Sequence, residues 1–341
     1  MTRKTPDKPT ARVTMKDVAL RAGVSQSTVS FVLNGMEDMR ISEETRRRVM
    51  RAVQELGYRA RGAGRPRKSN GYRMIGMILD EIATSPFAAI SIEGVQEEAW
   101  KNGILVEVAM TRGDKQYEAE LLRRWSEENA LGVIYSSILT REVALPDLLR
   151  RHRAVLLNCY DQAGEVTSVV PAERRGGELA TKALIDEGYR RIAFISGEPW
   201  MEASDQRMEG YERALRAARI PVDPSLIVEG NFMPSGGRDA TLRLMAMDAP
   251  PDAIFCANDL TAIGCYEGLK ELGLRPGGSV AVMGYDDQEI AQHLSPPLST
   301  VVLPHREMGQ LCVSVLSGQE HKPEQHRIEC PLALRASHRG E

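Results

Sequence analysis

The sequence lacks the apolar runs and signals that would place a protein in or across a membrane. No stretch approaches the about 18 consecutive apolar residues that a membrane-spanning helix needs. Residues 1–10 are polar, without the apolar stretch of a secretory signal. We therefore expect a cytoplasmic, nucleoid-associated protein with no membrane partner.

Cysteines and catalytic motifs are also scarce. The five cysteines are scattered, without a Cys-x-x-Cys pair or Cys/His cluster, so we expect reduced cysteines in or near the cores and no metal site. No Gly-x-Ser-x-Gly, Walker A or His-Glu-x-x-His motif is present, and the six histidines have no partnered nucleophile. The sequence predicts a protein that is not an enzyme and uses no cofactor.

Charge is present in quantity and is unevenly distributed. Residues 1–73 carry 17 Lys/Arg and 7 Asp/Glu, a net charge of +10, whereas the other 268 residues carry 27 and 40, a net charge of −13. A basic head on an acidic body indicates a polyanionic partner for the head. The alternative is a solvated basic tail without function. At 341 residues, two or three domains are expected.

Within the basic head, the sequence predicts three short helices. Thr14 is suited to cap the first, with Asp17 in its first turn, where an anion suits the helix dipole. Gly23 is suited to end this helix in a left-handed conformation. Ser25 is suited to cap the second helix, and Ser42 the third.

The spacing of three small residues favours a helix-turn-helix. Ala19, Gly23 and Val29 stand four and six positions apart. The small Ala19 lets the second helix approach closely, Gly23 makes the turn, and Val29 packs the second helix onto the first. These residue types are common, so the triplet alone also fits another small helical hairpin. Three short helices with a basic exterior over 13–58 predict a small DNA-reading domain.

A longer run carries a family resemblance. The segments V-T-M-K-D-V-A-x-x-A-G-V-S-x-x-T-V-S-x-V-L-N-G from residue 13, and I-S-E-E-T-R-x-R-V-x-x-A-V-x-E-L-G-Y from residue 41, resemble the headpiece of the lactose-repressor (LacI/GalR) family. The resemblance implies a sequence-specific transcriptional regulator, commonly a repressor, that binds a pseudo-palindromic double-stranded operator as a homodimer.

The resemblance also implies roles for individual residues. Gln26 and Ser27, at the start of the second helix, would face base edges in the major groove. Many family members have Arg at the position of Phe31, which here either touches a thymine methyl or packs on a neighbour. The positions that match phosphate contacts, which set register, are Thr14, Ser25, Thr28, Ser30, Asn34 and Tyr58.

The linker, residues 59–73, departs from the family. Relatives form a helix there that wedges a Leu into the minor groove, but Arg67 holds the wedge position and Pro66 precedes it. The run from Gly64 through Arg65 to Lys68 resembles an AT-hook, which predicts an extended arm at an A·T-rich operator centre. The alternative is a flexible basic linker that contacts phosphates alone.

From residue 74 the pattern predicts strands alternating with helices, hence parallel sheets covered on both faces. The expected strands are Met74–Leu79, Ile104–Ala109, Gly132–Tyr135, Ala154–Asn158, Ile192–Ser196, Ala253–Ala257 and Val280–Met283. The expected helices span 89–101, 115–129, 175–187, 205–218, 237–247, 260–272 and 304–316. Polar residues follow several strands, where such sheets bind ligands; Asn258 or Asp259 could equally cap a helix.

The resemblance continues over nearly the whole chain. It implies a core, 74–341, of two doubly wound α/β lobes similar to periplasmic sugar-binding proteins, joined by three crossovers. We expect one lobe from 74–170 and 303–320, and the other from 171–302 and 321–341. An effector, expected to be a sugar or sugar derivative, would bind between the lobes and control operator affinity.

By position, six residues match the family's effector site: Phe87, Asn158, Arg207, Phe232, Asn258 and Asp286. Arg donates and Asp accepts hydrogen bonds, which suits a polyol, and Phe232 matches an aromatic that stacks on a sugar face. Arg207 could equally bind a carboxylate or phosphate. Two departures stand out: Ala172-Glu173 replaces the usual Asp-Asn, and Asn158 replaces an Asp.

Overall fold

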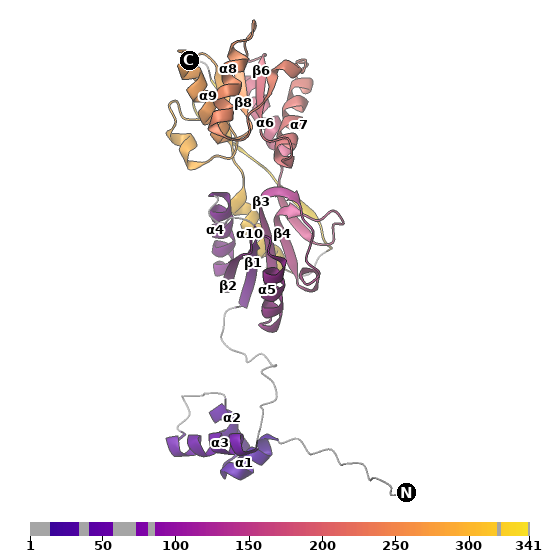
Figure 1. Ribbon diagram of the computed structural model, residues 1–341, viewed down its shortest axis with the longest axis vertical. Coiled ribbons are helices and arrows are strands. Elements are labelled where there is room, and N and C mark those ends of the chain that lie inside the picture. The colour runs from indigo at the N-terminus through magenta and orange to yellow at the C-terminus, as the bar shows by residue number, and fades with distance from the viewer. Residues whose placement is uncertain (1–13, 34–40, 57–72, 81–85, 319–321, 340–341) are drawn as a thin grey trace, which may run out of the picture. The chain divides into compact units, whose positions relative to one another are not determined.

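The computed structural model describes residues 14–33, 41–56, 73–80, 86–318 and 322–339. The chain divides into two compact units, Met1–Gly71 and Tyr72–Glu341 (Figure 1). No helix in the described ranges is long and apolar enough to span a bilayer.

The described part of the first unit forms the predicted helices α1 (Met15–Ala22), α2 (Gln26–Leu33) and α3 (Glu43–Leu56). Thr14 caps α1 as predicted, because its Oγ1 accepts from the Asp17 backbone and the Asp17 carboxylate accepts from the Thr14 N–H at 2.7 Å. Gly23 ends α1 with φ of 64°, which favours glycine.

The second and third helices are fixed in the same way. Ser25 Oγ accepts from the Thr28 N–H at 3.0 Å and caps α2, and Ser42 Oγ accepts from the Thr45 N–H at 3.3 Å and caps α3. The apolar sides of the helices meet in one small core: Val18, Ala19, Ala22, Val29, Val32, Val49 and Ala52. The predicted packing of Val29 onto the first helix is therefore confirmed.

The first lobe of the second unit is built on a six-stranded parallel sheet with the order β11-β5-β4-β3-β1-β2. Its strands are β1 (Arg73–Leu79), β2 (Ile104–Met110), β3 (Gly132–Glu142), β4 (Ala154–Tyr160), β5 (Thr167–Pro171) and β11 (Gln325–Ile328). Its helices are α4 (Pro86–Lys101), α5 (Lys115–Glu127) and α10 (His305–Ser317).

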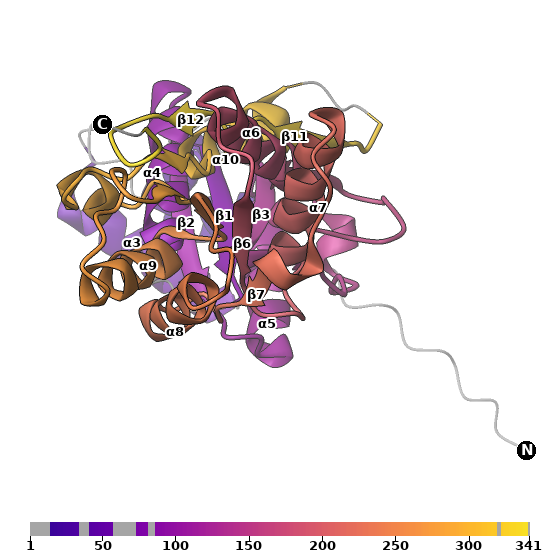
Figure 2. The ribbon, with the colours of Figure 1, turned by 90° about the horizontal axis from the view of Figure 1, so that it is seen from above.

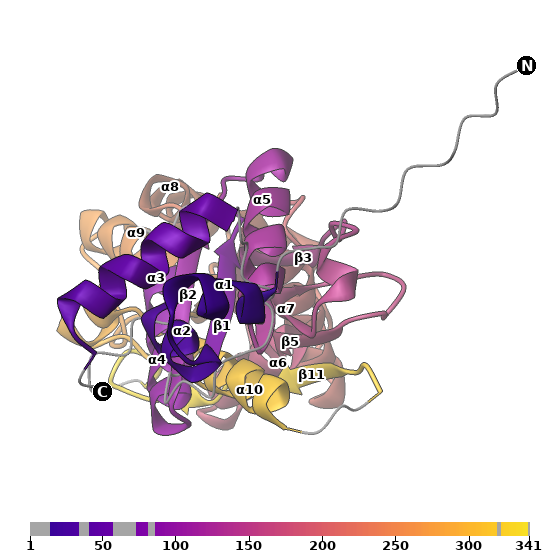
Figure 3. The ribbon, with the colours of Figure 1, turned by 90° about the horizontal axis from the view of Figure 1, so that it is seen from below.

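Both faces of this sheet are covered, as the apolar strands predict. Helices α4 and α10 pack on one face, where Met77 is buried with Val95 and Met308. Helix α5 packs on the other face (Figure 3). Trp125 of α5 is fully buried there, in the same core cluster as Ile78. Neighbouring residues of β1 therefore enter opposite cores.

The second lobe has a four-stranded parallel sheet with the order β7-β6-β8-β9. Its strands are β6 (Ile192–Ser196), β7 (Ile227–Glu229), β8 (Ala253–Cys256) and β9 (Ala281–Met283). Helices α6 (Glu173–Asp186) and α7 (Glu202–Ala217) cover one face, and α8 (Pro234–Met245) and α9 (Asp259–Glu271) the other (Figure 2). The order reverses at β6, and the carboxyl ends beside such a reversal are where ligands bind.

The chain passes between the lobes three times, after β5, before α10 and after β11. The expected placement of 321–341 in the second lobe is wrong for β11, which pairs with β5 in the first lobe's sheet. The chain then returns, and β12 (Leu332–Ala333) pairs antiparallel with β10 (Thr300–Val301). The polar sequence of β11 gave no apolar alternation by which to place it.

Candidate functional site

A cavity of about 260 Å³ lies where residues following β7, β8 and β9 of the second lobe meet the first lobe. The structure brings all six predicted effector-site residues to its wall: Phe87, Asn158, Arg207, Phe232, Asn258 and Asp286. The first lobe supplies Phe87 and Asn158, and the second lobe supplies the other four. Residues distant in sequence thus line one cavity, which is partly open to solvent.

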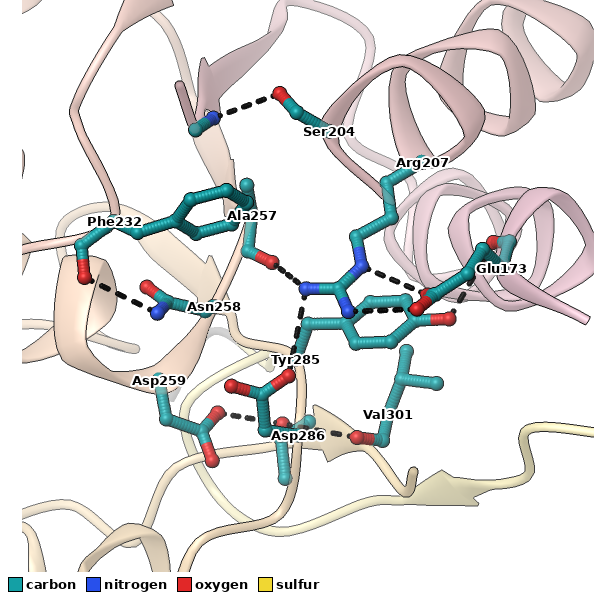
Figure 4. Close-up of polar contacts among 12 residues, drawn as sticks. Glu173, Ser204, Arg207, Phe232, Ala257, Asn258, Asp259, Tyr285, Asp286 and Val301 are labelled. Atoms are coloured by element: carbon teal, nitrogen blue, oxygen red, sulfur yellow. Dashed lines mark hydrogen bonds and ion pairs between the residues drawn. The ribbon is translucent and has the colours of Figure 1, made fainter. Parts of the chain in front are cut away.

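The centre of the polar wall is Arg207, whose side chain is 5% exposed. Its Nε donates to Glu173 Oε2 at 2.9 Å, and its Nη2 donates to Glu173 Oε1 at 3.0 Å (Figure 4). Its Nη1 donates to the Ala257 carbonyl at 2.6 Å and lies 3.4 Å from Asp286 Oδ1. The guanidinium is therefore held by two carboxylates and a backbone oxygen.

Aromatic rings pack around this guanidinium. Arg207 Cζ lies 3.7 Å from the centroid of the fully buried Tyr285 ring and 5.9 Å from that of Phe232 (Figure 4). Phe232 reaches its place because residue 197 is a glycine, where a Cβ would lie 1.9 Å from the ring. Burial lowers the pKa of Arg207, but the charges of Glu173 and Asp286 outweigh burial and raise it, so the guanidinium stays charged.

Glu173 is a site residue that the sequence did not assign. Glu173 departs from the family pattern, but the sequence does not show what it contacts. Its partner Arg207 lies 34 residues away, and no local sequence pattern predicts that pairing. Its side chain is 2% exposed and lies in the first turn of α6, beside the α6–α7 contact. A carboxylate in that turn also suits the helix dipole, so its position alone was ambiguous.

Two further carboxylates are buried below the guanidinium. Burial raises the pKa of Asp286 to about 7; Arg207 opposes this shift, but Glu173 adds to it and also occupies the guanidinium. Burial and the nearby charge of Asp286 raise the pKa of Asp259 to about 8, against hydrogen bonds from Thr300 Oγ1 and the Gln288 N–H. Both groups therefore hold protons far more strongly than an exposed Asp.

The two asparagines of the cavity are already engaged. Asn158 accepts from Thr140 Oγ1 at 2.7 Å and donates to the Ser137 carbonyl at 3.2 Å. Asn258 caps α9 by accepting from the Thr261 N–H at 2.8 Å, and it donates to the Phe232 carbonyl at 3.2 Å. The prediction that Asn258 caps a helix is therefore confirmed, and the same side chain also lines the cavity.

His305 is the second site residue that the sequence missed, because a lone histidine at the start of an apolar helix carries no signal. Its ring lies 5.1 Å from that of Phe87, and both rings line the cavity. Burial lowers the pKa of His305 to about 4, so the ring is neutral at physiological pH. Its Nε2 is buried and has no hydrogen-bond partner among the described residues.

The predicted DNA-facing residues have different environments in the first unit. Gln26 and Ser27 are exposed at the N-terminal end of α2, and Phe31 is half-buried. Thr14, Ser25 and Thr28 make the capping contacts of α1 and α2, so they also hold the helices that they begin. Four predicted residues lie outside the described ranges: Asn34, Tyr58, Arg65 and Arg67.

Neither cysteines nor metal ligands form a second site in the described ranges. All five cysteines are buried and unpaired, as predicted: Cys159, Cys256, Cys265, Cys312 and Cys330. No group of three or more His, Cys, Asp or Glu side chains there could hold a metal ion.

A helix-turn-helix unit joined to a two-lobed parallel-sheet unit with a cavity between its lobes defines a class of ligand-responsive DNA-binding regulators. Residues 14–60 match the family model described as bacterial regulatory proteins, lacI family, and residues 181–338 match a periplasmic binding protein-like domain. The chain belongs to the lacI family. It is a DNA-binding transcriptional regulator, not an enzyme.

Curated relatives and solved structures cover nearly the whole chain. The ribose operon repressor of Haemophilus influenzae is 34% identical, over 92% of this chain and 93% of the relative. The HTH-type transcriptional repressor PurR of Vibrio atlanticus is 35% identical, over 89% and 90%. A complex of the transcriptional regulator CelR with cellobiose has a TM-score of 0.64 at 31% identity, covering 96% of this chain and 100% of that one. The lac repressor dimer bound to operator and the anti-inducer ONPF has a TM-score of 0.68 at 25% identity, with the same coverage.

Proposed function

We propose that this protein is a repressor whose operator affinity is set by a sugar or sugar derivative bound in the cavity at Arg207. The observation that carries the proposal is that one cavity is lined by Phe87, Asn158, Arg207, Phe232, Asn258 and Asp286. Two aromatic faces and a few convergent polar groups are the usual composition of a small-molecule site. The relatives named for a ribose operon and for a cellobiose complex support the ligand class.

The position of the cavity between the lobes supplies a mechanism. A ligand that contacts Phe87 of the first lobe and Asp286 of the second stabilises the lobe arrangement that allows both contacts. A direct link between the lobes already exists, because Tyr160 Oη of β4 donates to Glu202 Oε2 of α7 at 2.8 Å. Ligand binding and the Tyr160–Glu202 contact together favour one arrangement of the two lobes. This shift between lobe arrangements is the source of the change in operator affinity.

For DNA recognition, we propose that Gln26 and Ser27 contact base edges, since both are exposed at the start of α2. Thr14, Ser25, Thr28, Ser30, Asn34 and Tyr58 would contact phosphates and set the register. Phe31 would meet a thymine methyl or its own neighbours. Arg65 and Arg67 would lie in an A·T-rich minor groove at the operator centre. Such a protein works where the chromosome is, on the nucleoid in the cytoplasm.

A homodimer would present two headpieces to a pseudo-palindromic operator. Strand β2 is an edge of the six-stranded sheet, and four large apolar side chains on β2 and the preceding α4 are exposed: Ile90, Trp100, Leu105 and Met110. Exposed apolar residues at a sheet edge are typical of an interface. A second copy of this chain is the partner we propose, in line with the dimer described for the lac repressor structure.

Thermal unfolding of the full chain with a panel of neutral sugars, sugar acids and nucleobases tests the proposal, because a bound ligand raises stability by mass action. Each ligand that raises Tm is then added to an operator-binding measurement. A ligand that raises Tm and changes operator affinity supports the proposal. Ligands that raise Tm without any effect on operator affinity contradict it.

A further inference from the structure

We infer that Glu173 makes the cavity reject anions, so that the ligand is an uncharged, hydroxylated molecule and Glu173 is a specificity-determining residue. The inference rests on the proposed effector site and adds to it the charge of the ligand and the residue that sets it. Arg207 alone would favour a carboxylate or phosphate, because its planar fork matches both. The pairing with Glu173 changes that preference.

The donors of Arg207 are almost fully used within the protein. A guanidinium has five N–H groups. Two of them meet the carboxylate of Glu173 at 2.9 and 3.0 Å, and Nη1 is directed to the Ala257 carbonyl at 2.6 Å and to Asp286 at 3.4 Å (Figure 4). To bind Arg207 through both Nε and Nη2, an anionic ligand would have to displace the buried carboxylate of Glu173.

The charges of the wall oppose an anion as well. Among the lining residues that the structure describes, the groups that can carry charge are Glu173, Arg207, Asp286 and His305. Glu173 balances Arg207, His305 is neutral, and Asp286 adds negative charge when it is ionised. An anion would therefore meet buried side chains whose summed charge is zero or negative.

The polar atoms that stay available suit hydroxyl groups. In Asn158 and in Asn258, the oxygen and one N–H already have partners within the protein, which leaves the second N–H of each amide to donate to a ligand oxygen. Carboxylate oxygens of Asp286 can accept further hydrogen bonds, and His305 Nε2 has no partner among the described residues. A hydroxyl can donate to the first and either donate to or accept from the second. The rings of Phe87 and Phe232 can cover the apolar faces of the ligand.

The test compares matched neutral and anionic probes on the full chain: D-ribose with D-ribose 5-phosphate, and D-glucose with D-glucuronate. Binding is measured by thermal shift and calorimetry for the wild type, Glu173→Gln and Glu173→Asn. The matched control is Glu178→Gln, which makes the same change on the same helix in a surface ion pair with Arg175.

We expect the anionic probes to leave the Tm of the wild type and the control unchanged. They should raise the Tm of at least one Glu173 variant, with affinity at least tenfold above that of the wild type, because Arg207 is then released. Anions that bind the wild type as tightly as the variants, or that bind neither, overturn the inference. If both variants fail to fold, the wild type decides: an anion that binds it more tightly than its neutral counterpart overturns the inference, and the reverse order supports it.

Failure of the inference is distinct from failure of the proposed function. An anion that binds the wild type and shifts operator affinity contradicts the role of Glu173 and leaves the effector site standing. A neutral probe that binds, loses its binding in Arg207→Ala and leaves operator affinity unchanged contradicts the proposed function and leaves the anion rejection standing.

Discussion

Arg207 and Glu173 form a buried two-pronged ion pair between α7 and α6, with Nε–Oε2 and Nη2–Oε1 distances of 2.9 and 3.0 Å. Both side chains are at most 5% exposed. An ion pair this deep repays the desolvation of its charges only while both partners are present. The pair therefore links the stability of the second lobe to the chemistry of the cavity.

Removing one partner of this pair should cost more stability than removing both. We expect Arg207→Met or Glu173→Gln alone to lower the free energy of unfolding by about 3–5 kcal/mol. The double variant should recover part of that loss, because no uncompensated charge stays buried. Urea unfolding of the wild type, the two single variants and the double variant measures this double-mutant cycle. A loss of stability in the double variant equal to the sum of the two single losses would contradict the coupling.

The buried Asp259 and Asp286 predict a stability that falls as pH rises. Burial raises both pKa values, to about 8 and about 7, so the folded state binds protons that the unfolded state releases above about pH 4. Their contribution to stability should therefore fall from about pH 5 to pH 8, by about 1 kcal/mol per pH unit for each proton involved. The buried neutral His305 has the opposite effect below about pH 6.5, because its pKa is lowered to about 4, so the net fall should be clearest above that pH. The groups that face this pair are Glu173, Arg207 and Asp287.

Asp286→Asn keeps an oxygen toward Arg207 and removes one titrating group. The free energy of unfolding should therefore fall less steeply with pH in this variant than in the wild type. Denaturant unfolding at a series of pH values measures it. The same dependence of stability on pH in the wild type and in Asp286→Asn would show that Asp286 is not protonated in the folded protein.

The helices of the core were largely predictable, whereas several strands were not. Strand Ile192–Ser196 was predicted with the observed bounds, because five consecutive apolar or small residues precede a turn. Five strands were missed: β5, β7, β10, β11 and β12. Strands β7, β10 and β12 have only two or three residues each, and β11 is polar and partly exposed. Their pairing depends on neighbours far away in the sequence.

The site shows the same division. The six predicted residues came from position along a family pattern, and they share one cavity. Glu173 and His305 could not be assigned, because their partners Arg207 and Phe87 lie on other elements. The sequence also left open whether the site at Arg207 prefers an anion or a polyol. This preference depends on whether Arg207 already has a partner, which is a property of the folded chain.

Exposure of Gln26 at the start of α2 predicts a role in base recognition. Gln26→Ala should weaken operator binding by about 1–3 kcal/mol and relax the preference at one base pair of each half-site. Affinity for random DNA should change little, because phosphate contacts dominate it. Fluorescence anisotropy with the operator and its single-base variants measures the effect. Equal weakening on operator and random DNA would contradict base readout.

The Arg65-Pro66-Arg67 segment predicts a preference for A·T pairs between the half-sites. Replacing the central pairs of the operator by G·C should weaken binding by the wild type. Arg67→Ala should weaken binding to the A·T operator and reduce this difference. Unchanged affinity on the G·C operator would favour phosphate contacts alone.

The most direct test of the account is operator affinity with and without a ligand that raises Tm, for the wild type and Arg207→Ala. Arg213→Ala, an exposed change on the same helix, is the control. We predict a ligand-dependent change in operator Kd of roughly 5- to 150-fold in the wild type and the control. In Arg207→Ala, the ligand should leave the operator Kd unchanged. The Kd of this variant without ligand should stay within about twofold of the wild type, which is well below the tenfold change that corresponds to 1.4 kcal/mol. Equal loss of operator binding and ligand response in Arg207→Ala would contradict the division between a DNA-reading unit and a ligand-sensing unit.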